Sequence, residues 1–118
     1  MLVIFEMISE NLNINYKVFG KKEGNVLTFP DKTYPNTIMT VIMEEDCVEI
    51  KRSGNVVMNQ RFKFNSKEEG FYKNDQGLEF KIASFTTEIT ITINQIEVFY
   101  ENYIEDQWQS SNKLKIIF

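Results

Sequence analysis

The sequence contains no histidine, a single cysteine at position 47 and only two arginines among its thirteen basic residues. Without histidine, the usual nucleophile–base pairs of acyl-transfer enzymes and the common metal centres of hydrolases cannot be assembled. A pair of carboxylates of the glycosidase kind stays open, because a sequence does not show which strands bring side chains together. Cys47 can form no disulfide within the chain, and we expect it to be a small buried or half-buried side chain. These absences predict a protein that is not an enzyme and needs no metal or cofactor.

Positive charge and long apolar runs are also scarce. Thirteen Lys and Arg residues stand against seventeen Asp and Glu residues, and the net charge of −4 argues against a surface that neutralises nucleic-acid phosphates. No segment approaches the ~20 apolar residues of a membrane span. The N-terminal apolar run is too short for a signal peptide and has no basic residues before it. We therefore expect a cytoplasmic protein that binds neither nucleic acid nor membranes.

The chain does contain enough apolar material for one folded domain. Hydrophobic residues make up 42% of the 118 residues and aromatic residues 14%, a composition that supports a packed core. There is no linker, repeat or low-complexity segment, and the length is typical of one domain. We therefore predict a single domain over residues 1–118.

Hydrophobic and polar residues alternate with a period of two along most of the chain, which is typical of half-buried β-strands. The clearest pair of strands covers residues 88–93 and 96–101, separated by Asn94-Gln95. A two-residue hairpin loop would make the facing pairs Ile93 and Ile96, Ile91 and Val98, and Ile89 and Tyr100. All six side chains then fall on one face, as an antiparallel pair with one buried face requires.

A second hairpin is predicted for residues 37–43 and 47–53, joined by the acidic segment Glu44-Glu45-Asp46. A three-residue loop there would make the facing pairs Ile42 and Val48, Thr40 and Ile50, and Ile38 and Arg52. The acidic segment itself is expected to be a solvent-exposed turn, because its spacing does not match a calcium-binding loop.

The next turn, at Ser53-Gly54-Asn55, decides which way the two arginines point. A two-residue loop would set apolar residues opposite charged ones, whereas an odd-length or bulged turn groups the apolar residues on one face. Both Gly54 and Asn55 tolerate the positive φ angles that such turns require. Arg61 is then predicted to face solvent beside Glu49. The inner face is predicted to carry Val48, Ile50, Arg52, Met58, Gln60 and Phe62.

Further short strands are predicted over residues 2–9, 12–20, 26–29, 70–73, 78–85 and 113–118. Residues 105–111, which include Trp108, are expected to form a loop. A meander of this kind must protect the edges of its sheet, and closing the sheet on itself does so. The predicted fold class is therefore all-β, a single antiparallel β-barrel of eight to ten strands.

Several of these residues form a spaced pattern, which consists of Arg52-x-Gly54, Gln60-Arg61-Phe62, Gly70-x-Tyr72, Gly77 and Thr87. In order and spacing this pattern resembles the YwiB-like family of bacterial proteins, and the resemblance extends from about Leu12 onward. The chain differs at Asn74-Asp75-Gln76-Gly77, where only the glycine matches the family's turn. The resemblance implies a calycin-like barrel, related in architecture to lipocalins and fatty-acid-binding proteins. It implies no substrate, because the family has no assigned function.

Arg52 is the candidate functional side chain, and two interpretations of it are open. It ends its strand, so it could extend past the rim of the barrel into water. Alternatively, Arg52 and Gln60 line the interior near Met58 and Tyr72 and bind the head of a ligand. An interior guanidinium needs a carboxylate, from the ligand or from the protein, because burying it unpaired is costly. Replacing Arg52 by Met is then expected to leave the fold intact and to abolish the binding of an anionic ligand.

Two functions are compatible with this pattern. The first is a non-enzymatic barrel, monomeric or weakly dimeric, that binds a small amphipathic or anionic molecule. Its candidate ligand-binding residues are Arg52, Gln60, Tyr72 and Met58. The second is an interaction or regulatory module with a filled interior, which contacts a protein partner through an outer apolar patch. The candidate patch residues are Phe99, Tyr103 and Trp108. Interior volume distinguishes the two, since ligand pockets begin at about 300 Å³.

Overall fold

The computed structural model describes all 118 residues, and every regular element in it is a β-strand. The strands are β1 (Leu2–Ile8), β2 (Asn13–Phe19), β3 (Lys21–Glu23), β4 (Val26–Pro30), β5 (Thr37–Met43), β6 (Cys47–Gly54), β7 (Val57–Lys63), β8 (Lys67–Lys73), β9 (Glu79–Ile91), β10 (Gln95–Ile104) and β11 (Gln107–Ile117). They form one 11-stranded sheet in the order β2-β1-β11-β10-β9-β8-β7-β6-β5-β4-β3, and all neighbouring strands are antiparallel. No helix long and apolar enough to cross a membrane is present.

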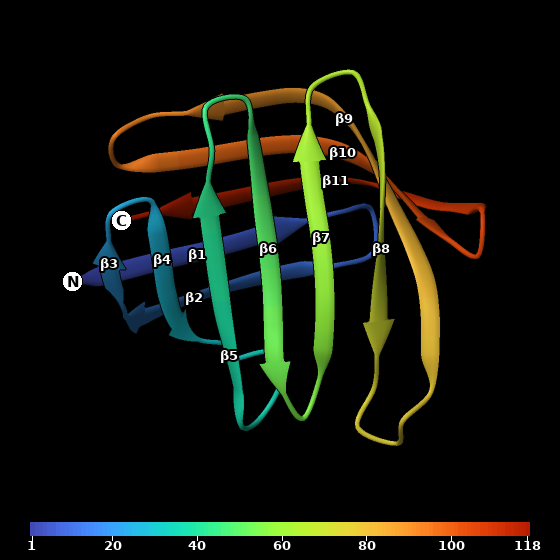
Figure 1. Cartoon of the computed structure of the whole chain (residues 1–118), viewed down its shortest axis with the longest axis horizontal. Helices are drawn as coiled ribbons and strands as arrows, with labels where there is room; N and C mark the ends of the chain where they lie inside the picture. The colour runs from blue at the N-terminus through green and yellow to red at the C-terminus, as the bar shows by residue number, and fades with distance from the viewer.

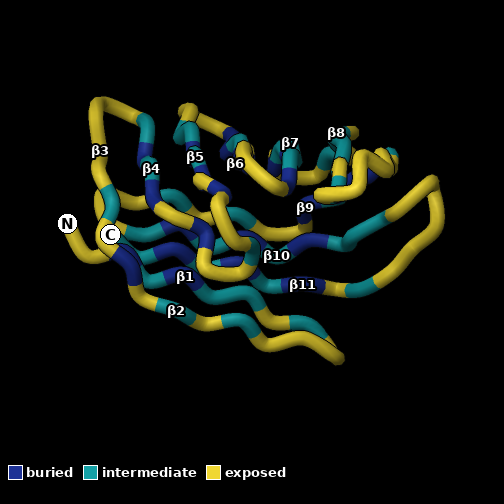
Figure 2. The backbone as a smooth tube through the Cα atoms, turned by 90° about the horizontal axis from the view of Figure 1, so that it is seen from below, coloured by how far each residue is buried: buried dark blue, intermediate teal, exposed yellow.

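The sheet folds over into two layers whose strands cross at a steep angle (Figure 1). Strands β5–β8 form one layer and run nearly perpendicular to β1, β2, β10 and β11 in the other, while the long β9 curves from one layer into the other. The two edge strands are β2 and β3, and β2 lies against β4, so the barrel is nearly closed. Figure 2 shows the buried residues between the layers. The predicted antiparallel β-barrel is confirmed.

The barrel has eleven strands, more than the eight to ten expected. The additional strand is β3, three exposed charged residues that show no apolar alternation and are ordered by pairing with β4. The expected loop over residues 105–111 is wrong, because Glu105 and Asp106 alone turn the chain, both with positive φ, and β11 begins at Gln107. Trp108 is therefore a residue of strand β11, where it pairs with Tyr103 of β10. The residues at the start of β11 are mostly polar and exposed, so the alternation of apolar and polar residues did not identify this part of the strand.

The β5–β6 hairpin has a different register from the predicted one. The last pair is Met43 with Val48, so residues 44–47 lie between the paired positions of this hairpin, although Cys47 already pairs with Lys63 of β7. Two hydrogen bonds close it at that length, from the backbone N–H of Glu44 to the carbonyl of Cys47 at 2.9 Å and from the thiol of Cys47 to Glu44 Oε2 at 3.2 Å. A register shift of one residue moves every side chain of a strand to the opposite face of the sheet. The inner side chains of β5 are therefore Thr37, Met39 and Val41. The sequence had placed three different side chains on that inner face. They lie on the outer face instead and are Ile38, Thr40 and Ile42.

The β9–β10 hairpin keeps the predicted face, but its register is two residues away from the predicted one. The observed pairs are Ile91 with Ile96 and Ile89 with Val98. The turn is longer because Thr92 donates its backbone N–H to the carbonyl of Gln95 at 2.8 Å, which leaves Ile93 91% exposed at the tip. A bulge after Phe99 then places Tyr100 opposite Thr86.

The β6–β7 hairpin has the predicted register. Glu49 pairs with Arg61 on the outside, where the two side chains approach to 3.7 Å, and Arg52 points to the inside. The turn contains Gly54 with a φ of 133°, and a Cβ at this position would collide with the carbonyl oxygen of Asn36. Glycine is therefore required where this turn meets the loop before β5.

Apolar side chains fill only one end of the barrel. A single cluster of 15 buried residues occupies that end, and its largest fully buried members are Phe5, Phe29, Phe62, Leu27 and Met39. At the other end the inner side chains are both polar and apolar, and they leave a cavity between the layers. The candidate site lies there.

Candidate functional site

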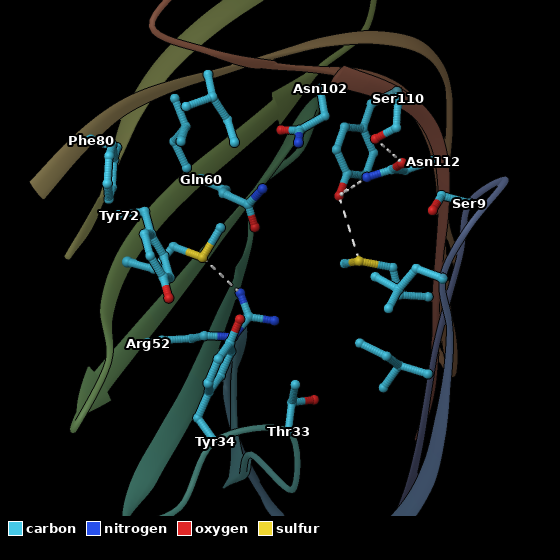
Figure 3. A pocket seen from close by; sticks show the side chains of 17 residues that line it. Ser9, Thr33, Tyr34, Arg52, Gln60, Tyr72, Phe80, Asn102, Ser110 and Asn112 are labelled. Carbon is cyan, nitrogen blue, oxygen red and sulfur yellow. Dashed lines mark hydrogen bonds between the residues drawn. The ribbon is translucent and has the colours of Figure 1, made fainter. Parts of the chain in front are cut away.

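A cavity of about 400 Å³ lies between the two layers at the unfilled end of the barrel. One wall comes from β6, β7, β8 and the start of β9, the opposite wall comes from β1, β2, β10 and β11, and the β4–β5 loop closes one side (Figure 3). Of the 17 lining residues, 10 are hydrophobic. The volume and the mixed lining are those of small-molecule pockets.

Arg52 enters this cavity from β6 and is paired with Asp31, which directly follows β4. Nε of Arg52 donates to Oδ2 of Asp31 at 2.7 Å, and the two side chains are 6% and 0% exposed. Such a buried pair is stable only when further hydrogen bonds satisfy both groups. The interpretation of Arg52 as a rim residue that reaches water is therefore wrong.

Two protein groups besides Arg52 hydrogen-bond to Asp31. Its Oδ1 accepts hydrogen bonds from the backbone N–H of Thr33 at 2.8 Å and from the hydroxyl of Tyr16 at 3.2 Å. Burial and then the negative charge of Asp31 raise the pKa of Tyr16 well above its ordinary value, so this phenol stays a donor. Asp31 is thus a fixed support that orients the guanidinium of Arg52.

The outer nitrogens of Arg52 are only partly used. Nη1 lies 3.1 Å from Sδ of Met58, a weak acceptor, and Nη2 makes no hydrogen bond within the protein. The ring of Tyr34 is centred 5.9 Å from the guanidinium carbon. An arginine has five N–H donors, so the two hydrogen bonds of this guanidinium leave three donors without a protein acceptor. Figure 3 shows this edge of Arg52 directed toward the open part of the cavity.

Tyr34 and Tyr72 meet beside Arg52. Burial is the largest cause of the raised pKa of Tyr34, followed by the neighbouring Tyr72. Tyr72 also stacks on Phe80, with ring centroids 6.3 Å apart. This side of the cavity therefore presents a guanidinium edge flanked by aromatic rings.

A second polar group centres on Tyr100. Its hydroxyl accepts a hydrogen bond from Nδ2 of Asn112 at 3.2 Å, and Oδ1 of Asn112 accepts one from Ser110 at 2.7 Å. Burial raises the pKa of Tyr100, although the hydrogen bond from Asn112 and the positive charge of Arg52 oppose the shift. The buried Gln60 projects into the cavity from the wall that carries Arg52.

A family model described as a domain of unknown function (DUF1934) matches residues 6–116. The chain belongs to this family. The crystal structure of the ywiB protein from Bacillus subtilis has the same fold, with a TM-score of 0.65 over 98% of this chain and 85% of that chain, at 18% sequence identity. The resemblance to the YwiB-like family is thereby confirmed. A search of curated proteins gave no match.

The DUF1934 barrel brings the predicted site residues together. The four residues predicted to bind a ligand, which all line this one cavity, are Arg52, Met58, Gln60 and Tyr72. The sequence interpretation missed four further residues of the site, Asp31, Tyr34, Tyr100 and Asn112. Asp31 and Tyr34 lie in an irregular segment where no periodic pattern applies. The one signal for Asp31 was the requirement that an interior guanidinium have a carboxylate partner.

The residues predicted for a protein-binding patch lie on the outer face of β10 and β11. Trp108 is 54% exposed. The ammonium of Lys67 lies 4.2 Å from the ring centre of Tyr103, and that of Lys113 lies 5.8 Å from the ring centre of Phe99. Lysines therefore lie over two of the three rings, and Trp108 is the most exposed of them.

Cys47 lies outside the cavity, at the start of β6, and is fully buried. Burial, followed by its hydrogen bond to Glu44, raises the pKa of its thiol to about 11. A thiol of this kind is inert at neutral pH. No group of three or more His, Cys, Asp or Glu side chains is arranged to hold a metal ion.

Proposed function

We propose that this DUF1934 protein is a cytoplasmic, non-enzymatic binding barrel that holds a small amphipathic molecule by its anionic or polar head. The observation that carries the proposal is the state of Arg52. Its Nε is held by Asp31, and its outer edge, with three donors that lack a protein acceptor, faces a cavity of about 400 Å³. These donors reach the open space of the cavity, where a ligand that supplies an anionic acceptor can form charge-assisted hydrogen bonds with them.

The rest of the cavity suits an apolar ligand body. Away from Arg52 the lining includes the apolar side chains Met7, Leu12, Ile14, Ile82 and Ile104. Removing apolar surface from water contributes about 25 cal/mol per Å². A molecule with its head at Arg52 and its body against these side chains therefore uses both parts of the lining.

Native mass spectrometry of the protein, purified from its own cytoplasm without denaturation, tests the proposal. We expect a small-molecule adduct that is lost when the protein is unfolded and refolded. The refolded protein should then bind an amphipathic anionic probe, anilinonaphthalene sulfonate, with a fluorescence increase.

Two variants locate the probe. Asp31→Asn combined with Arg52→Met removes the charged pair from the cavity and should weaken probe binding. Arg61→Met makes the same arginine-to-methionine change on the outer face and should leave binding unchanged. A protein that carries no adduct and does not bind the probe after refolding would contradict the proposal.

An interaction or regulatory module that acts through Phe99, Tyr103 and Trp108 is the second candidate, favoured by the exposure of Trp108. The same spectra distinguish it, because a partner adds the mass of a protein and a second copy doubles the mass of the chain. A protein-sized adduct that is lost in the Trp108→Ala variant would favour this candidate over ligand binding.

A further inference from the structure

We propose that the head group bound in this cavity is a monocarboxylate, held by the outer edge of Arg52, with Asp31 as the positioning residue. The inference rests on the proposed binding function and narrows it to one ligand class. It follows from three features of the site, which are its charge balance, the shape of the outer guanidinium edge and the phenols beside it.

The charge balance limits the head to a single negative charge. Arg52 is the only charged side chain in the lining, and Asp31 cancels its charge from behind. A bound carboxylate brings the cluster to a net charge of about −1, whereas a phosphate monoester, which carries about −1.5 to −2 at pH 7, brings it close to −2. Salt screens charges in a buried site poorly. The dianion is therefore disfavoured.

The outer edge of Arg52, where the only protein acceptor is Sδ of Met58, matches a carboxylate in shape. Nη1 and Nη2 lie in one plane and can donate two parallel hydrogen bonds to the two oxygens of a carboxylate. Asp31 fixes this plane through Nε at 2.7 Å, and Thr33 and Tyr16 in turn fix Asp31. The edge is thus oriented before the ligand arrives, which reduces the entropy lost on binding.

The two phenols beside Arg52 supply a further donor. Tyr34 and Tyr72 both line the cavity, and each phenol carries one hydroxyl hydrogen that it can donate. Burial raises the pKa of Tyr34 above its ordinary value, so this hydroxyl stays protonated at neutral pH. A carboxylate oxygen can accept from this hydroxyl as well as from the guanidinium, whereas a neutral alcohol oxygen gains much less from either donor.

The test compares three ligands that share a decyl chain and differ in the head, namely decanoate, decanol and decyl phosphate, by isothermal titration calorimetry on the refolded protein. Decanoate is expected to bind at least about tenfold more tightly than decanol, because hydrogen bonds to charged groups are the stronger ones. Decanoate should also bind more tightly than decyl phosphate. A second series with a flat body, of 2-naphthoate, 2-naphthol and 2-naphthyl phosphate, repeats the comparison.

Variants separate the positioning role of Asp31 from a structural one. Asp31→Asn keeps the size of the side chain and removes its charge, so the preference for carboxylate over phosphate should decrease or reverse. The double variant Asp31→Asn/Arg52→Met should lose the preference for carboxylate over alcohol while still binding the alcohol. Arg61→Met should keep both preferences of the wild type.

Equal binding of carboxylate and alcohol by the wild type, or tighter binding of the phosphate, overturns the inference and leaves the binding function standing. An unchanged carboxylate-to-phosphate ratio in Asp31→Asn overturns the role assigned to Asp31. If no member of either series binds, the proposed binding function fails, and the inference fails with it.

Discussion

Replacing Arg52 by Met is expected to destabilise the protein strongly, in contrast to the tolerance expected from the sequence. The reason is Asp31, whose side chain is 0% exposed and accepts the Nε hydrogen bond at 2.7 Å. The substitution removes the cation and leaves the carboxylate buried. The remaining donors, Thr33 and Tyr16, are neutral and do not replace the lost charge.

The magnitude follows from the burial of the pair. Removing one partner of a buried ion pair costs about 3–5 kcal/mol. Whole domains are stable by only about 5–15 kcal/mol, so this is a large share. For a chain of this length a loss of 1 kcal/mol lowers the Tm by about 4 °C, so Arg52→Met should melt about 12–20 °C below the wild type.

The double variant Asp31→Asn/Arg52→Met should recover most of that loss. It removes both charges, and replacing a buried pair as a whole is often nearly neutral. Urea unfolding followed by circular dichroism gives the free energies of the wild type, both single variants and the double variant. The resulting double-mutant cycle should show a coupling of at least about 2 kcal/mol between the two positions.

Two results would refute this reasoning. An Arg52→Met protein within about 1 kcal/mol of the wild type would mean that the Asp31 carboxylate is not buried against the guanidinium in solution. A double variant as unstable as the single one would mean that the loss comes from packing around Arg52 rather than from an unpaired charge. The binding assays above are carried out on the double variant for this reason.

Three further outcomes are expected. Arg61→Met should change the free energy of unfolding by no more than about 1 kcal/mol in urea titrations, because its ion pairs are partly exposed and 3.4–3.8 Å long. A larger loss would contradict its outer position. The thiol of Cys47 has a pKa of about 11 in place of an ordinary 9. Iodoacetamide at pH 8.5 should therefore alkylate it at least about a hundredfold more slowly in the folded protein than in urea. Similar rates would refute its burial. Folding raises the pKa values of Tyr16, Tyr34 and Tyr100 and so favours their neutral forms. The free energy of unfolding should therefore be constant below pH ~10 and decrease as the pH rises further. An ultraviolet titration in which all tyrosines ionise together near pH 10 would contradict this.

The fold was predictable because alternation of apolar and polar residues identifies strands and the faces they bury. The β6–β7 register was correct because only one loop length kept Phe62 with the other apolar residues of that face. The β5–β6 register was wrong because both faces of β5 are apolar, so the pattern did not distinguish Met39 from Ile38. Hydrogen bonds within the turn, between Glu44 and Cys47, decide that case, and they follow no periodicity.

The partner of Arg52 was not predictable from pattern. Asp31 lies 21 residues earlier, in an irregular segment, and the two side chains meet only because β4 and β6 flank β5 in the sheet. A loop carboxylate usually lies in solvent, and nothing local in the sequence marks this one as buried. The pairing is set by the arrangement of three strands together with the conformation of the loop that follows β4.

The division of the barrel into a filled and a hollow end is, by contrast, present in the sequence as a gradient along the inner faces. The inner side chains of β6 change from apolar to charged toward its end, in the order Val48, Ile50, Arg52. Those of β11 change from polar to apolar away from its start, in the order Ser110, Asn112, Leu114, Ile116. The cavity lining contains the polar members of both series, while the apolar members belong to the core cluster. A dry core cannot form around side chains that need hydrogen-bond partners, so the polar ends of these strands meet where the barrel stays open. The position of the cavity therefore follows from the inner-face pattern once the strand order is known. The state of Arg52, the charged side chain in its lining, follows from its pairing with Asp31, a residue that the pattern does not include.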